Sequence, residues 1–119
     1  VLGVTFKPNT DDMRDSPSLE IIPAMQKAGA KIRAFDPEGM DEARALLDDV
    51  QWCDNAYATM EGADALVIIT EWNAFRGLDF KRIKSLLNKP VMVDLRNIYN
   101  PDEMAAAGID YHCLGRPGR

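Results

Sequence analysis

The chain has 119 residues, which suits one domain with a single hydrophobic core and leaves too little length for a second. Its net charge of -5, with no block of Lys or Arg, argues against nucleic acid as a partner. With 46% hydrophobic and 28% charged residues, and no apolar run of membrane-spanning length, we expect a globular, cytoplasmic protein that does not contact a membrane.

The chain begins with a predicted strand, a long loop and a helix. Residues 1–5 are apolar and read as a buried strand, and residues 6–15 are charged and rich in turn formers. Ser16 and Pro17 are typical of a helix start, as N-cap and first helical position. Pro23 falls inside this helix, where it predicts a kink or a tightened first turn.

The loop is the most informative segment for function. Loops between a strand and a helix usually have ~2–6 residues, so a longer one that carries Lys7 and Arg14 indicates a ligand site. In open α/β sheets, ligands bind beyond the carboxyl ends of the strands, where this loop begins. The alternative is a well-capped turn, in which Asp11 and Asp12 are solvated and pair with the two cations.

Strands and helices alternate along the rest of the chain. Three helices are expected to end at a glycine, which accepts the left-handed conformation there: Gly29, Gly62 and Gly108. Further strands are predicted at residues 31–35, 50–53, 65–69, 91–93 and 109–113, and further helices at 41–47, 79–88 and from 101 onward. Continuous apolar runs suit strands covered on both faces. The pattern therefore predicts an α/β fold, a three-layer Rossmann-like sandwich with a mainly parallel sheet of about six strands.

A second cation is expected at the same edge of the sheet. Arg96 closely follows a predicted strand, so in a parallel sheet it emerges beside Lys7. A guanidinium offers a bidentate fork and an ammonium a compact charge, and the two together fit a diphosphate. The alternative is a surface pair between Arg96 and Asp94, which needs no ligand.

Three other residues stand near predicted strand ends. Trp72 is expected to pack the end of its strand, while Glu71 could face the ligand crevice. Asp36 lies where a dinucleotide-binding fold places the carboxylate that holds a ribose. No Gly-x-Gly-x-x-Gly follows the first strand, so we expect that this sheet holds no dinucleotide of its own.

Three segments together resemble a known family. FKPNTDDMRDSP at residues 6–17, TEW at 70–72 and VDLRNIY at 93–99 are similar to the C-terminal UDP-binding domain of the UDP-glucose 6-dehydrogenases. The resemblance covers residues 1–116 and leaves residues 117–119 as a tail. It implies an NAD-dependent enzyme of nucleotide-sugar and polysaccharide biosynthesis. Such an enzyme oxidises UDP-glucose twice, to UDP-glucuronate, through a thioester on a cysteine.

The resemblance also implies roles for single residues and partners for the domain. Phe6, Lys7 and Arg96 occupy positions that bind the UDP-sugar, and Arg14 occupies a position that reaches NAD. The cofactor itself would be bound mainly by an N-terminal domain that this chain lacks. The expected partners are that NAD-binding domain, a central domain and further copies of the full-length enzyme.

No residue of this chain is predicted to be catalytic. The family's nucleophilic cysteine lies in an upstream motif that neither Cys53 nor Cys113 matches, and a strand cysteine is most often inert core. His112 is the single histidine, and its spacing from the cysteines fits no metal site. We therefore expect an excised enzyme domain that is inactive by itself.

Two alternatives stay open at this point. Dehydrogenases of GDP-mannose and of UDP-N-acetylmannosamine share part of the same motif framework, although residues 8–10 and 95–99 favour the UDP-glucose branch. From a different functional class, the chain could be a stand-alone nucleotide-binding module. An upstream glycine-rich unit and cysteine motif in the source gene would separate these interpretations.

Overall fold

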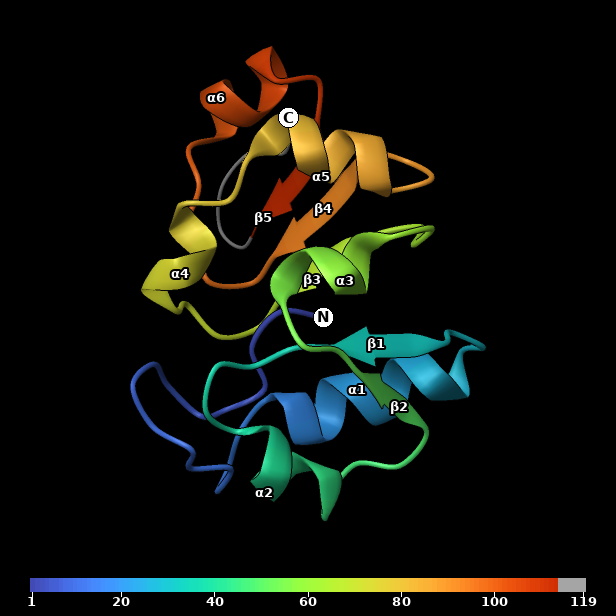
Figure 1. Ribbon diagram of the computed structural model, residues 1–119, viewed down its shortest axis with the longest axis vertical. Coiled ribbons are helices and arrows are strands. Elements are labelled where there is room, and N and C mark those ends of the chain that lie inside the picture. The colour runs from blue at the N-terminus through green and yellow to red at the C-terminus, as the bar shows by residue number, and fades with distance from the viewer. Residues whose placement is uncertain (114–119) are drawn as a thin grey trace.

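The computed structural model describes residues 1–113, and the expected tail at 117–119 lies outside them. Over this range the strands form two parallel sheets. One sheet pairs β1 (Ile32–Ala34) with β2 (Val50–Trp52), and the other has the order β3 (Leu66–Ile68), β4 (Val91–Asp94) and β5 (Asp110–Cys113). The five strands and the helices between them are shown in Figure 1.

The first segment does not form the predicted strand. Leu2 instead makes isolated parallel bridges to Phe35 and Ile68, and so connects the two sheets. Gly3 then takes a φ of 83°, which breaks the extended backbone. A Cβ atom at Gly3 would lie 2.5 Å from the Cβ atom of Thr70, so the close approach requires glycine. The prediction of a strand at residues 1–5 is therefore wrong. The predicted number of about six strands is not confirmed, since the described residues contain five.

Six helices connect the strands in the described part of the chain. They are α1 (Ser18–Lys27), α2 (Met40–Arg44), α3 (Ala56–Met60), α4 (Asn73–Arg76), α5 (Phe80–Leu86) and α6 (Pro101–Ala106). The side chains of Asp79 and Asn100 cap α5 and α6 by accepting N–H groups of the first turn. α1 begins at Ser18, later than predicted. Its first turn is tightened as expected, because the N–H groups of Leu19 and Glu20 bond three residues back.

The two faces of the sheet are covered by different helices. Leu66 and Ile68 of β3 belong to a core cluster with residues of α3, α5 and α6, whereas Val67 and Ile69 join a second cluster with residues of α1 and α2. Figure 1 shows α1 and α2 gathered around β1 and β2, and α5 and α6 around β4 and β5. The predicted Rossmann-like α/β architecture with parallel pairing is confirmed.

Candidate functional site

The carboxyl ends of β1, β3 and β4 meet at one edge of the fold. We call this the carboxyl edge and define it by Asp36, Thr70 and Arg96, which follow those strands, together with loop residues 6–16. Hydrogen bonds connect its parts: the Thr70 hydroxyl donates to Thr5 O at 2.7 Å, and the Arg96 Nε donates to Ile69 O at 2.7 Å. Strand ends and loop therefore form one continuous surface, as parallel strands predict.

Arg96 reaches across this edge from β4 toward the loop. Besides the bond to Ile69, one terminal nitrogen of its guanidinium lies 3.5 Å from Phe6 O, and its Nε lies 3.8 Å from Glu71 Oε2. The side chain is 31% exposed, so part of the guanidinium faces solvent. The alternative of an Arg96–Asp94 surface pair is not what the structure shows, because Asp94 Oδ1 accepts the main-chain N–H of Arg96 at 3.0 Å.

Phe6 and Lys7 lie where Arg96 arrives. The Phe6 ring is 44% exposed, and the Lys7 side chain is also exposed. Phe6 N–H donates to Asp12 O at 2.8 Å, which closes the loop on itself. The structure thus brings the Arg96 guanidinium to the main chain of Phe6, the residue that precedes Lys7.

Arg14 stands apart from this group. It forms a two-point pair with Asp12, with distances of 3.1 Å from Nε to Oδ1 and 3.0 Å from a terminal nitrogen to Oδ2. Its hydrogen bonds hold the pKa of the Asp12 carboxyl below its usual value, and the same pairing raises the pKa of Arg14. Because the Arg14 side chain is 90% exposed, a stronger anionic ligand can displace Asp12 at little cost.

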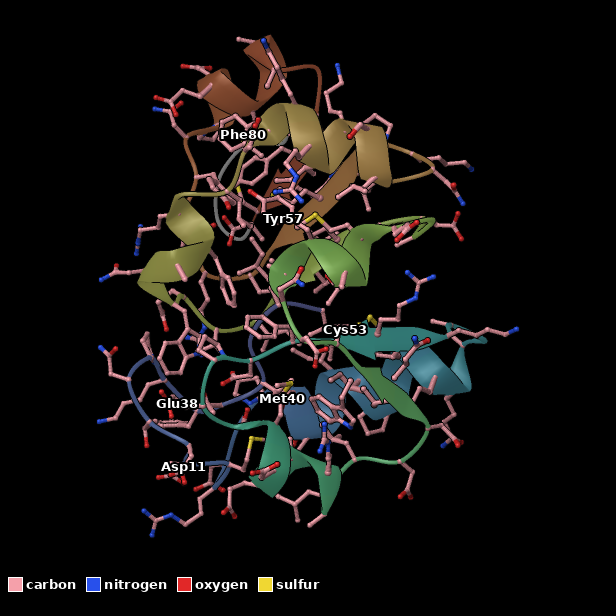
Figure 2. All side chains as sticks on the ribbon, in the orientation of Figure 1. Asp11, Glu38, Met40, Cys53, Tyr57 and Phe80 are labelled. Carbon is pink, nitrogen blue, oxygen red and sulfur yellow. The ribbon has the colours of Figure 1, made fainter. Side chains whose placement is uncertain are left out.

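An open depression lies beside Arg14. It has a volume of about 580 Å³ and is formed by loop residues, α1 and the region of α2: Thr10, Asp11, Asp12, Met13, Arg14, Leu19, Glu42 and Leu46. Figure 2 shows Asp11 and Glu38 on the side of the molecule that carries this loop. Apart from Arg14 its charged lining residues are acidic, so Arg14 is the lining side chain whose charge attracts an anion.

Two buried carboxylates shape the carboxyl edge, and sequence reasoning missed this role. Asp94 Oδ2 accepts the Tyr111 hydroxyl at 2.6 Å and the N–H groups of Ile98 and Tyr99 at 2.8 and 3.2 Å. Burial raises the pKa of Tyr99. With the Arg96 N–H on its other oxygen, Asp94 fixes the turn from which the Arg96 side chain departs.

Asp36 is the second buried carboxylate. It is fully buried, and both of its oxygens accept hydrogen bonds from within the chain. A carboxylate that holds a ribose must face solvent before the ligand arrives, so Asp36 does not fit that role in this structure. An aspartate directly after a strand was the available sequence signal, but its burial depends on distant residues.

The remaining candidates have structural surroundings. Trp72 is 7% exposed and belongs to the core, which confirms its predicted packing role, and Glu71 is half-buried near Arg96. Cys53 and Cys113 are free thiols, and burial raises the pKa of Cys53. Within residues 1–113, no group of three or more acidic, His or Cys residues could hold a metal ion, and no helix is long and apolar enough to cross a bilayer.

Sequence comparisons identify relatives of this chain. Residues 1–101 match the family model described as UDP-glucose/GDP-mannose dehydrogenase family, UDP binding domain. UDP-glucose 6-dehydrogenase from Rhizobium meliloti (strain 1021) is 56% identical over 117 residues, covering 98% of this chain and 27% of the relative. UDP-glucose 6-dehydrogenase TuaD from Bacillus subtilis (strain 168) is 45% identical over 118 residues, covering 98% of this chain and 26% of the relative.

Among solved structures, nucleotide-sugar dehydrogenases are similar to this chain as well. A UDP-glucose dehydrogenase from the archaeon Pyrobaculum islandicum superposes with a TM-score of 0.75 at 33% identity, covering 93% of this chain and 23% of that one. NDP-N-acetyl-D-galactosaminuronic acid dehydrogenase from Methanosarcina mazei Go1 gives a TM-score of 0.82 at 31% identity, covering 97% of this chain and 24% of that one. The chain thus spans about a quarter of the length of the proteins it matches.

Proposed function

Since this chain belongs to the UDP-glucose/GDP-mannose dehydrogenase family and is its C-terminal UDP-binding domain, we propose that it holds UDP-glucose in an NAD-dependent UDP-glucose 6-dehydrogenase. The observation that supports this most directly is the reach of Arg96 from β4 to the carbonyl of Phe6, which brings one cation to the main chain that carries Lys7. We assign residues 1–116 to the domain and 117–119 to a tail.

The carboxyl edge suits the diphosphate part of the substrate. Arg96 presents a planar guanidinium that can form two parallel hydrogen bonds to phosphate oxygens, and Lys7 adds a mobile point charge. Phe6 contributes an exposed ring next to Lys7. The buried carboxylates Asp36 and Asp94 hold the backbone beneath these side chains, so the main chain that carries the cations is fixed before the ligand binds.

NAD does not fit the end of β1. Asp36 has both oxygens bonded inside the chain, and no glycine-rich turn follows the first segment. We therefore assign NAD mainly to an N-terminal domain, where it would accept the hydride from C6 of the sugar. Arg14 is the residue of this chain that reaches toward it. We assign the catalytic cysteine to a motif upstream of this chain, so the role of this chain is to bind and orient UDP-glucose.

The assembly that we propose is a cytoplasmic homo-oligomer in which this domain packs against NAD-binding and central domains. The other candidates were a GDP-mannose dehydrogenase, a UDP-N-acetylmannosamine dehydrogenase and a stand-alone module. The names of the two curated relatives do not favour these alternatives.

Calorimetry with UDP tests the binding site. In the intact protein, Lys7→Ala should weaken UDP binding by about one to two orders of magnitude, because a charge-assisted hydrogen bond is lost. Lys89→Ala is the matched control, since Lys89 is exposed and precedes the amino end of β4. Unchanged affinity in a folded Lys7→Ala variant, or preference for GDP over UDP, would contradict the proposal.

Activity tests the enzyme assignment. NADH absorbance should rise when the intact protein meets UDP-glucose and NAD, and should not rise with this chain alone. A rate that follows the concentration of repurified chain would overturn its role as a binding domain only.

A further inference from the structure

Asp36 receives more hydrogen bonds than its own turn requires. Its Oδ1 accepts two N–H groups of that turn, from Glu38 at 2.9 Å and Gly39 at 2.8 Å. This is the ordinary pattern of an aspartate that closes a local turn. Its Oδ2 accepts from distant segments, namely Val4 N–H at 2.8 Å, Thr5 N–H at 3.2 Å and the Trp72 indole N–H at 3.2 Å. One oxygen therefore serves the turn and the other joins three parts of the chain.

The residue that Asp36 holds most completely is Thr5. Thr5 is fully buried, and its carbonyl accepts the Thr70 hydroxyl at 2.7 Å. Its own hydroxyl lies 3.0 Å from Lys7 O and 3.3 Å from Asp36 Oδ2. Its methyl group lies against Gly39, where a Cβ atom would come within 2.3 Å of it. Thr5 thus has a fixed position immediately before the exposed residues of the loop.

Two exposed residues of the loop begin directly after Thr5. Phe6 and Lys7 follow Thr5 directly, and the Arg96 guanidinium lies 3.5 Å from Phe6 O. Any shift of Thr5 therefore displaces Lys7 relative to Arg96. The position of the Lys7 main chain relative to Arg96 therefore depends on the Asp36 carboxylate, which has no hydrogen bond to either residue.

We propose that Asp36 is a positioning residue of the UDP site. Asp36 fixes the position of Lys7 through Thr5, and its bond to Trp72 connects Thr5 to the segment that follows β3. This inference rests on the proposed function, in which Lys7 contacts the diphosphate. Preorganisation is the physical reason, because a loop held in its binding position loses less conformational freedom when the ligand arrives.

Asp36→Asn is the informative substitution. It keeps the size of the side chain but replaces one acceptor by an NH₂ group that faces N–H donors. We expect the dissociation constant for UDP to rise about tenfold in the intact protein, measured by calorimetry below the melting transition. Met104→Ala is the control, because Met104 is fully buried in α6 and its truncation leaves a cavity that lowers the free energy of unfolding. This control should leave UDP affinity within about twofold.

A double-mutant cycle separates positioning from a general loss of stability. If Asp36 acts through Lys7, Asp36→Asn should weaken UDP binding little further in a Lys7→Ala background. Equal weakening with and without Lys7, or an unchanged affinity in the folded single variant, would overturn the inference. Where Asp36→Asn does not fold, Thr70→Val removes the bond to Thr5 O and should give the same non-additive pattern with a smaller effect.

Hydrogen exchange tests, without any ligand, whether Asp36 holds the loop in place. Amides of residues 4–14 should exchange faster in Asp36→Asn than in Met104→Ala, starting with the Phe6 N–H that bonds Asp12 O. Unchanged exchange in this segment would overturn the positioning role even if UDP binds. A wild-type protein that shows no UDP binding would instead overturn the proposed function, and the exchange data would still decide whether Asp36 anchors the loop.

Discussion

Replacing Tyr111 by Phe removes one hydroxyl beneath the carboxyl edge and leaves the core packing in place. The Tyr111 ring is fully buried in β5, and its hydroxyl donates to Asp94 Oδ2 at 2.6 Å. Asp94 is itself fully buried and holds the turn that carries Arg96. The substitution therefore withdraws one donor from a buried carboxylate without creating a large cavity.

The expected loss can be worked out from this geometry. A hydrogen bond to a charged group contributes about 1.5–3 kcal/mol, and the missing oxygen adds little because the ring remains. Asp94 keeps the N–H groups of Ile98 and Tyr99, so the charge is not left without donors. For a domain of this size each kcal/mol shifts the melting temperature by about 3–6 °C, so the total decrease should be roughly 5–18 °C.

Urea and thermal unfolding followed by tryptophan fluorescence measure this loss. The matched control is Tyr57→Phe, because the Tyr57 hydroxyl accepts the Asp79 N–H at 2.9 Å in an exposed position, where water can replace it. The control should lose less than about 1 kcal/mol. Equal losses in the two variants would refute the reasoning and would mean that Asp94 does not depend on the Tyr111 hydroxyl.

Substitutions at four further positions test the site and the fold. Arg96→Ala should weaken UDP binding by about one to two orders of magnitude in calorimetry, and Arg96→Lys should restore it only in part, because the planar fork is lost. Arg14→Ala should raise the KM for NAD in steady-state kinetics and leave UDP affinity nearly intact. If binding of NAD and of UDP weakened equally and the melting temperature fell, the role of Arg14 would instead be to stabilise the loop. Gly3→Ala should cost roughly 3 kcal/mol or more in denaturant unfolding, because a Cβ atom would lie 2.5 Å from that of Thr70. Gly62 has a φ of 72°, and a Cβ atom added there would meet no atom within 4 Å beyond its chain neighbours. Gly62→Ala should therefore lower the free energy of unfolding by only about 1–2 kcal/mol.

Local features of the fold could be predicted from the sequence. Gly29, Gly62 and Gly108 all take positive φ values after their helices, and Asp79 and Asn100 cap α5 and α6. These outcomes depend on the chemistry of one residue and its close neighbours in the chain, so a short window of sequence contains the information. The apolar runs likewise predicted parallel strands, and the position of Arg96 after one of them placed it at the carboxyl edge.

Only the tertiary structure decided how those pieces meet. Residues 1–5 have a strand-like composition, but Gly3 bends where the backbone passes close to Thr70. Asp36 lies at the sequence position of a ribose ligand, but only the tertiary structure buries it and occupies both of its oxygens, with donors from its own turn and from distant segments. The path of Arg96 toward Phe6 is set in the same way. Each of these depends on atoms brought together from remote parts of the chain, and periodicity or spacing cannot supply that information.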